Sequence, residues 1–307
     1  MPAARGHSGA RENGRARENG GERLLRMRVM KNRLFARTVI FFSVLTISPI
    51  LLIVYKLVAK GYRQINFDFF TKTAPDTYEA MLATGAGEII PGGILNGIAG
   101  TLYMVLIASL IAIPIGLLIG IFLYDQQSKR YAAIVRDITD ILQGVPSIVL
   151  GLIAYFWVVK NITNGFSALA GSTALAIMMM PLIIRSTEET LKMIPENIRE
   201  AGFALGVPYH KIILRVLIPS GFSGLMTGIL LAISRIIGET APLMLTALGS
   251  MEVNFQIDKP TSAIPLLIWE FYNDPNMVDL IWSSSLLLMM MVLLLNLLSR
   301  QIIARRS

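Results

Sequence analysis

The sequence predicts an all-α integral membrane protein with six transmembrane helices. Hydrophobic residues make up 54% of its 307 residues and gather in long runs, whereas charged residues make up only 16%. A helix that spans a bilayer needs about 20 apolar residues, so the chain has room for six spans and the polar segments between them. Soluble domains carry roughly 25% charged residues, so the composition argues against that class.

The chain starts with a polar, basic tail over residues 1–37. Its Gly, Asn and alternating charges cannot bury enough apolar surface to fold, which predicts disorder. Residues 38–57 are the first apolar run, and they are too many for the core of a cleavable signal peptide. We therefore expect an uncleaved transmembrane helix there. A polar periplasmic or extracellular segment over residues 58–98 follows it and ends at a Pro-Gly-Gly turn.

The remaining spans are expected in a core that covers residues 99–303. Five apolar runs predict them, at residues 100–124, 138–159, 167–184, 220–248 and 280–298. Pro114 lies inside the first of these runs, where neighbouring helices can satisfy the carbonyl that a proline leaves free. Pro146 and Ser147 lie inside the second, and we expect them to start or kink a helix there.

The distribution of Lys and Arg predicts the orientation in the membrane. Most of these residues lie in the tail, in the connector 125–143, in the segment 185–219 and after the last span. The alternate segments hold only Lys60, Arg63, Lys72, Lys160 and Lys259. Because cytoplasmic segments carry the excess of positive charge, both termini and the segment 185–219 are expected in the cytoplasm. The net charge of +8 then fits a lipid bilayer as partner, with no nucleic acid.

The residue inventory excludes several kinds of chemistry. There is no Cys and there are two His, so disulfides, cysteine nucleophiles and histidine-built metal sites are not expected. Asp137 and Asp140 can in principle hold a metal or relay protons, but such residues more often cap a helix or face water. A phosphate-binding G-x-x-x-x-G-K-[ST] loop is also lacking. We therefore predict no catalytic, cofactor-binding or metal-binding residue in this chain.

The segment 186–219 has the pattern of short helices joined by tight turns. Ser186 and Glu189 fit a capping box at a helix start. Pro195 suits the first turn of a second helix, and Gly206 suits the left-handed residue that ends it. These helices are too short and too charged to span a membrane. Their apolar sides need a cover, either from the chain's own membrane helices or from another protein.

Within this segment, one pattern resembles the EAA loop of binding-protein-dependent ABC importer permeases. It consists of Glu200-Ala201-Gly202, three residues, Gly206, nine residues and then Val216-Leu217-Ile218-Pro219. The family has Ala, Ile and Leu where this chain has Gly202, Val216 and Ile218. The resemblance implies a type I ABC importer permease fold whose coupling helices contact a separate ATPase. It implies that Glu200, Ala201 and Gly206 form the coupling element, and that a dimer of ATP-binding subunits binds ATP and Mg.

Three other stretches resemble the permeases of phosphate-specific ABC importers, at residues 92–102, 143–149 and 234–243. The form Gly-Glu-Thr-Ala-Pro at residues 238–242 resembles the A-type of the two permeases in that branch. The resemblance implies inorganic phosphate as cargo, a second permease of the C type and a soluble phosphate-binding protein outside the membrane. No covalent change of the cargo is implied in this chain.

Arg235 and Glu239 are the candidate residues of the substrate path. Arg235 lies deep in the apolar run 220–248, where a charge costs about 2.5–3.5 kcal/mol on insertion scales, so we expect it to face a wet cavity. Its planar guanidinium matches phosphate oxygens. Glu239 follows four residues later on the predicted helix face, where it can neutralise Arg235 or accept a hydrogen bond from protonated phosphate. The alternative is an Arg–Glu pair that only ties helices together.

Three rival functions stay open on the sequence. One is an ABC permease for another oxyanion, such as molybdate, sulfate or phosphonate. Another is a self-contained secondary transporter, whose uptake would continue without ATP. The third is a membrane scaffold without transport, which would leave Arg235 and Glu239 unexplained.

Overall fold

The computed structural model describes residues 8–126 and 129–304. Within these ranges the regular structure is helical, apart from a single β-bridge between Leu248 and Thr261. The chain divides into two units, Met1–Lys56 and Leu57–Ser307, and each is described by itself. The prediction of an all-α protein is confirmed.

Several helices have the length and composition of membrane spans. Four qualify as single helices: Met30–Gly61, Leu95–Asp125, Ala168–Lys192 and Pro275–Gln301. Two bent pairs qualify only together: Arg130–Gly144 with Ser147–Val159, bent by 105°, and Tyr209–Ser220 with Phe222–Ile237, bent by 74°. The described part of the chain therefore has four to six candidate spans, and the count of six stays a prediction.

The first unit consists of one long helix, most of α1 (Ser8–Gly61), with Pro49 inside it. The structure differs from the prediction of a disordered tail over residues 1–37. Residues 1–7 lie outside the described residues, but residues 8–37 belong to α1. Arg, Glu, Leu and Met are good helix formers, so a helix begun in the apolar run 38–57 can extend toward the N-terminus.

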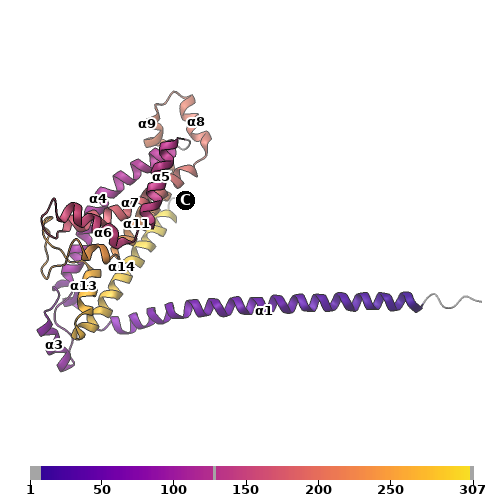
Figure 1. Cartoon of the computed structure of the whole chain (residues 1–307), viewed down its shortest axis with the longest axis horizontal. Helices are drawn as coiled ribbons and strands as arrows, with labels where there is room; N and C mark the ends of the chain where they lie inside the picture. Colours follow the sequence, from indigo (N-terminus) through magenta and orange to yellow (C-terminus); the bar gives the residue numbers. More distant parts are fainter. Residues whose placement is uncertain (1–7, 127–128, 305–307) are drawn as a thin grey trace, which may run out of the picture. The chain divides into compact units, whose positions relative to one another are not determined.

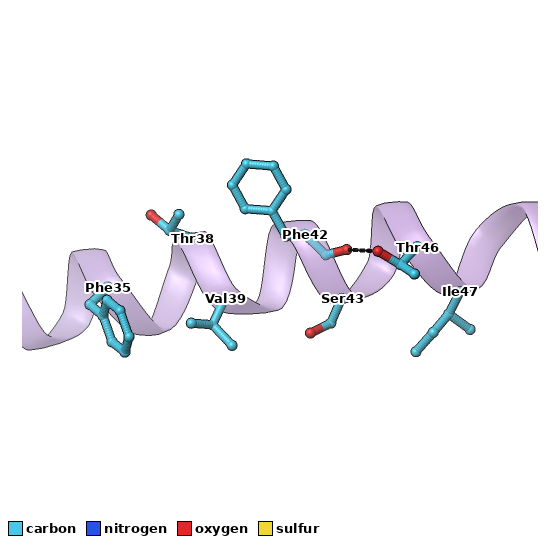
Figure 2. A pocket seen from close by; sticks show the side chains of 7 residues that line it. All are labelled: Phe35, Thr38, Val39, Phe42, Ser43, Thr46 and Ile47. Atoms are coloured by element: carbon cyan, nitrogen blue, oxygen red, sulfur yellow. Dashed lines mark hydrogen bonds between the residues drawn. The ribbon is translucent and has the colours of Figure 1, made fainter. Parts of the chain in front are cut away.

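The apolar side chains of α1 stand exposed along the first unit. Figure 2 shows one stretch of this surface, lined by Phe35, Thr38, Val39, Phe42, Ser43, Thr46 and Ile47. The Thr46 hydroxyl donates a 2.8 Å hydrogen bond to the Phe42 carbonyl, so the helix itself satisfies this polar group. A helix that is apolar around its circumference and satisfies its own hydroxyls is suited to a lipid environment.

The second unit is built on four long helices (Figure 1): α4 (Leu95–Asp125), α7 (Ala168–Lys192), α11 (Phe222–Ile237) and α14 (Val278–Ala304). α4 packs along α7, α7 packs on α11, and α11 packs on α14. The contact between α7 and α11 is very close at Gly228, where a Cβ atom would lie 1.7 Å from the Ser186 hydroxyl oxygen. Small residues permit this approach of two helix backbones.

Shorter helices connect the long ones. Before α4 lie α2 (Phe67–Thr71) and α3 (Thr77–Ala86), capped by the side chains of Asn66 and Asp76. The connection from α4 to α7 contains α5 (Arg130–Gly144), α6 (Ser147–Ala154) and the π-helix η1 (Tyr155–Val159). The connection from α7 to α11 contains α8 (Glu196–Ala204), α9 (Tyr209–Ile212), the π-helix η2 (Ile213–Leu217) and α10 (Ile218–Ser220). The connection from α11 to α14 contains α12 (Ala241–Met244), α13 (Ile264–Tyr272) and the 3₁₀-helix η3 (Pro275–Met277).

Two predicted boundaries are wrong, and one predicted break is confirmed. Ser186 does not begin a helix, because α7 continues through it to Lys192. The apolar run 220–248 is not one helix, because α11 ends at Ile237 and only the short α12 follows. The bend of 105° between α5 and α6 falls at Val145 and Pro146, where a helix start was expected.

Candidate functional site

The break between α11 and α12 holds both candidate path residues. Arg235 lies in the last turn of α11, and Gly238 ends that helix. Glu239 therefore belongs to the linker and not to the helix face of Arg235, which corrects our prediction. Pro242 lies at the start of α12, where a proline fits because the first turn has no partner for its missing N–H.

Apolar packing fixes the position of this break. Ile236, Ile237 and Leu243 are buried in the main core of the second unit, on either side of the linker. α12 also packs on α6 and α7. Because its neighbours face the core, Arg235 is directed to the open side of the bundle, and its side chain is 41% exposed.

Arg235 and Glu239 are close but not tightly bonded. The Arg235 Nε atom lies 3.9 Å from the Glu239 Oε1 atom, at the outer limit of an ion pair, and the Glu239 side chain is 19% exposed. The neighbouring Ser234 hydroxyl is buried without a hydrogen-bond partner among the described residues. Three groups therefore meet at the break: the Arg235 cation, which is free to bind another anion, the Glu239 carboxylate and the unsatisfied Ser234 hydroxyl.

An open cavity of about 670 Å³, with both polar and apolar lining residues, lies between the end of α5, α7 and α11. Its lining residues include Gln143, Arg185, Ser186, Glu189, Thr190 and Thr227. The Arg185 Nε atom donates to the Asp140 Oδ1 atom at 2.9 Å, and Nη2 also bonds this carboxylate. Asp140 thus serves as an ion-pair partner. Among the side chains that the structure describes, no three His, Cys, Asp or Glu gather as metal ligands would.

The sequence did not predict a buried charge cluster near the C-terminal end of α7. The Glu188 side chain is 1% exposed, and its Oε1 atom accepts from Arg136 Nε at 2.7 Å and from Lys192 Nζ at 2.6 Å. Arg136 also donates to the Leu123 carbonyl at 2.9 Å. One arginine therefore ties α5 to α7 and to the end of α4. The only sequence signal was Glu188 with Lys192 four residues later.

The predicted coupling element has the expected local structure. Gly206 has φ = +69°, and its N–H donates to Phe203 O at 2.9 Å while the Val207 N–H donates to Gly202 O at 3.2 Å. These two bonds are those of a Schellman motif, which ends a helix. Glu200 and Ala201 are exposed on α8, a helix without a buried residue. α8 thus offers a free surface.

The rest of this segment is anchored more firmly. Ile212 and Leu217 are buried in a small core with Tyr124 and Leu191. The Tyr209 hydroxyl donates to Asp125 at the end of α4. Burial of the Tyr209 phenol, and then its bond to the Asp125 carboxylate, raise the pKa of this tyrosine. Both effects favour the protonated phenol, which is the form that donates this bond.

These features fit one class of protein, the multi-pass membrane transport subunits. They are the long apolar helices, the charged residue at a break between helices and the projecting pair of short helices. Residues 112–305 match the family described as binding-protein-dependent transport system inner membrane component. This chain belongs to that family.

Relatives that cover most of the chain are phosphate transport system permease proteins named PstA. The protein of Yersinia pestis is 37% identical over 257 residues, which are 83% of this chain and 83% of that protein. The protein of Pasteurella multocida is 34% identical over 91% of this chain and 97% of its own length. The protein of Mycobacterium leprae is 33% identical over 89% of this chain and 88% of its own length.

Solved structures show the same fold. A chain of the MetNI methionine ABC transporter, in an inward-facing conformation, superimposes with a TM-score of 0.58. It is 22% identical, and the match covers 69% of the present chain and 94% of that chain. At this identity the likeness concerns the fold alone, and it agrees with the type I ABC importer permease fold that the EAA-like pattern implied.

Proposed function

We propose that this chain is one of two permease subunits of an ATP-driven importer that moves inorganic phosphate across the cytoplasmic membrane. The observation that carries the proposal is the similarity to PstA proteins over more than four-fifths of the chain. The partners are a PstC-like second permease, a dimer of PstB-like ATPase subunits that binds ATP and Mg, and a PstS-like phosphate-binding protein outside the membrane. Both termini then lie in the cytoplasm.

The proposed mechanism is alternating access. The binding protein delivers phosphate to the outer side. Closure of the ATPase dimer then moves α8, and this movement changes the orientation of the spans around the path. Glu200, Ala201 and Gly206 make the contact with the ATPase. The exposed side chains of Ile198, Phe203 and Leu205 support this assignment, because apolar groups on a polar loop are stabilised when a partner covers them.

Arg235 and Glu239 are proposed to line the path. The first turns of α11 follow the charged segment 185–219, and Arg235 lies roughly 20 Å further along the helix at 1.5 Å per residue. That distance is about two-thirds of a 30 Å hydrocarbon layer. A cation at this depth that faces the open side of the bundle is suited to a passing anion. The second permease would complete the enclosure.

The test is phosphate uptake by the assembled complex with Arg235→Gln and Arg235→Lys. A hydrogen bond to a charged group contributes about 1.5–3 kcal/mol, so we expect the Gln variant to lose tenfold or more in uptake and the Lys variant to lose less. Arg63→Gln is the control, because Arg63 is exposed in the turn that follows α1. Normal uptake by an assembled Arg235→Gln complex would remove Arg235 from the path.

The same assay separates the rival functions. Competition by molybdate, sulfate or phosphonate equal to that by unlabelled phosphate would assign another oxyanion as cargo. Uptake that continues after ATP is depleted, with no ATPase co-purified, would instead indicate a secondary transporter.

A further inference from the structure

Aromatic side chains attach α8 to α9 and α4, in addition to the packing of Ile212 against Gly202. The ring of Phe203 on α8 stacks on that of Tyr209 on α9, with centroids 6.0 Å apart and planes at 8°. The guanidinium of Arg199 lies 6.0 Å from the ring centre of Phe203 and 6.0 Å from that of Tyr124. Tyr124 is buried near the end of α4. A planar cation between two rings is held by attraction to both.

A hydrogen bond also joins α9 to the C-terminal end of α4. The Tyr209 hydroxyl donates to one carboxylate oxygen of Asp125, the last residue of α4. The Gln126 side-chain amide donates to the other oxygen. The carboxylate is thereby oriented toward Tyr209. Residues Tyr124 and Asp125, which are adjacent, thus hold α8 and α9 respectively.

α4 is a suitable element to carry a movement across the bundle. It is a single helix from Leu95 to Asp125, with Pro114 inside it, and it packs along α7. Near its other end, the Thr101 hydroxyl accepts a 2.9 Å hydrogen bond from the Ile264 N–H at the start of α13. Figure 1 shows α8 and α9 at one end of the second unit and α3 at the opposite end, with α4 running between. A rigid helix transmits displacement as a body.

We propose that Arg199, Tyr209 and Asp125 form the joint through which movement of α8 reaches α4. The three are positioning residues, since none of them lies at the path. The inference rests on the proposed function for the source of the movement, but the contacts themselves do not depend on the cargo. Tyr209 is the hinge of the joint, because it contacts α8 through its ring and α4 through its hydroxyl.

The first test compares ATP hydrolysis with phosphate uptake in proteoliposomes that contain the full complex. Tyr209→Phe keeps the stacked ring and removes the hydroxyl. We expect phosphate imported per ATP hydrolysed to fall about fivefold or more, the lower end of typical coupling between sites, while the ATPase stays bound. Tyr272→Phe is the control, because Tyr272 is an exposed tyrosine on α13, an element that does not belong to the proposed joint. It should leave the ratio unchanged.

A double-mutant cycle shows whether Tyr209 and Asp125 act as one unit. Asp125→Ala should lower the ratio as Tyr209→Phe does. The double variant should be no worse than either single variant, because both remove the same bond. Losses that multiply would show that the two residues act separately, which would overturn the joint. An equal fall of hydrolysis and uptake in Tyr209→Phe would also overturn it, since that is the result of a structural defect.

The second test needs neither cargo nor ATPase. The chain has no Cys, so Leu205→Cys at the C-terminal cap of α8 and Leu118→Cys on α4, both at exposed positions, can carry two spin labels. In the full chain in lipid nanodiscs, we expect one narrow distance distribution that broadens with Tyr209→Phe and not with Tyr272→Phe. A distribution unaffected by Tyr209→Phe would overturn the joint. If the wild-type chain shows the narrow distribution but never binds an ATPase, the proposed function fails and the joint stands.

Discussion

At the scale of single residues, Gly206 is the position where sequence and backbone are most directly linked. Its φ of +69° belongs to the left-handed region, which side chains other than Gly adopt at a cost of about 1 kcal/mol. A Cβ atom there would meet no other atom within 4 Å, so the cost of a substitution would come from the backbone alone.

We therefore predict that Gly206→Ala destabilises the end of α8 by about 1 kcal/mol. Hydrogen exchange should show faster exchange at the Gly206 and Val207 amides, which make the two capping bonds. Gly85→Ala is the control, because Gly85 lies inside α3 with equally open space and an ordinary φ, and Ala should slow exchange in α3 by a similar free energy. Unchanged exchange at Val207 would contradict the role of the cap.

Sequence reasoning at this scale succeeded where the information was local. The cap at Gly206 follows from one glycine after an amphipathic stretch. The bond between Tyr209 and Asp125 joins residues 84 positions apart, and no spacing rule pairs them. Glu239 was misplaced for a related reason: a spacing of four places two residues on one face only if the helix continues between them, and it stops at Ile237.

At the scale of elements, the buried carboxylate of Glu188 holds the cytoplasm-facing ends of three helices, in the proposed orientation. Arg136 contributes from α5, Lys192 contributes from α7, and Arg136 reaches the Leu123 carbonyl on α4. Because Glu188 is almost inaccessible while both cations are partly exposed, removing its charge leaves two cations at a low-dielectric site.

Glu188→Gln should therefore destabilise the protein by about 3 kcal/mol, the lower end for breaking a buried ion pair. The measurement is thermal unfolding of the purified chain in detergent, followed by circular dichroism. Glu189→Gln is a matched control, since the next carboxylate is exposed and its neutralisation should change stability by less than about 0.5 kcal/mol. Equal unfolding temperatures for the two variants would contradict the structural importance of the Glu188 cluster.

The elements that the sequence misjudged have a common physical cause. Ser186-Thr187-Glu188-Glu189 fits a capping box, but the same side chains also suit a helix interior. There Ser186 lies against Gly228 of α11, and Glu188 is paired with Arg136. Tertiary contacts decide between the two, and those contacts involve residues about 40 or 50 positions away. The apolar runs themselves were predictable, because hydropathy depends on composition alone.

At the scale of the whole molecule, the large apolar exposed surface requires a cover. Exposed leucines follow one another along α4 at Leu102, Leu106, Leu110 and Leu118, and others occur along α14. Their spacing places them on one side of the helix, while Ala108 and Ala112 are buried on the other. Such a surface is compatible with lipid or with a second membrane subunit, and it is not compatible with water.

The orientation of the chain in the membrane decides whether α8 can meet an ATPase, and it can be tested directly. Because the chain has no Cys, Leu205→Cys at the C-terminal cap of α8 and Glu88→Cys after α3 would each be the only thiol, at exposed positions. α8 and α3 lie at opposite ends of the second unit (Figure 1). The excess of Lys and Arg in residues 185–219 predicts that α8 is cytoplasmic. In cells that make this chain without the ATPase, so that Leu205 is not covered, a membrane-impermeant maleimide should then label Glu88→Cys in intact cells and Leu205→Cys only after the membrane is opened, with the parent chain unlabelled throughout. Labelling of Leu205→Cys in intact cells would place α8 outside, where no ATP-driven subunit could act on it.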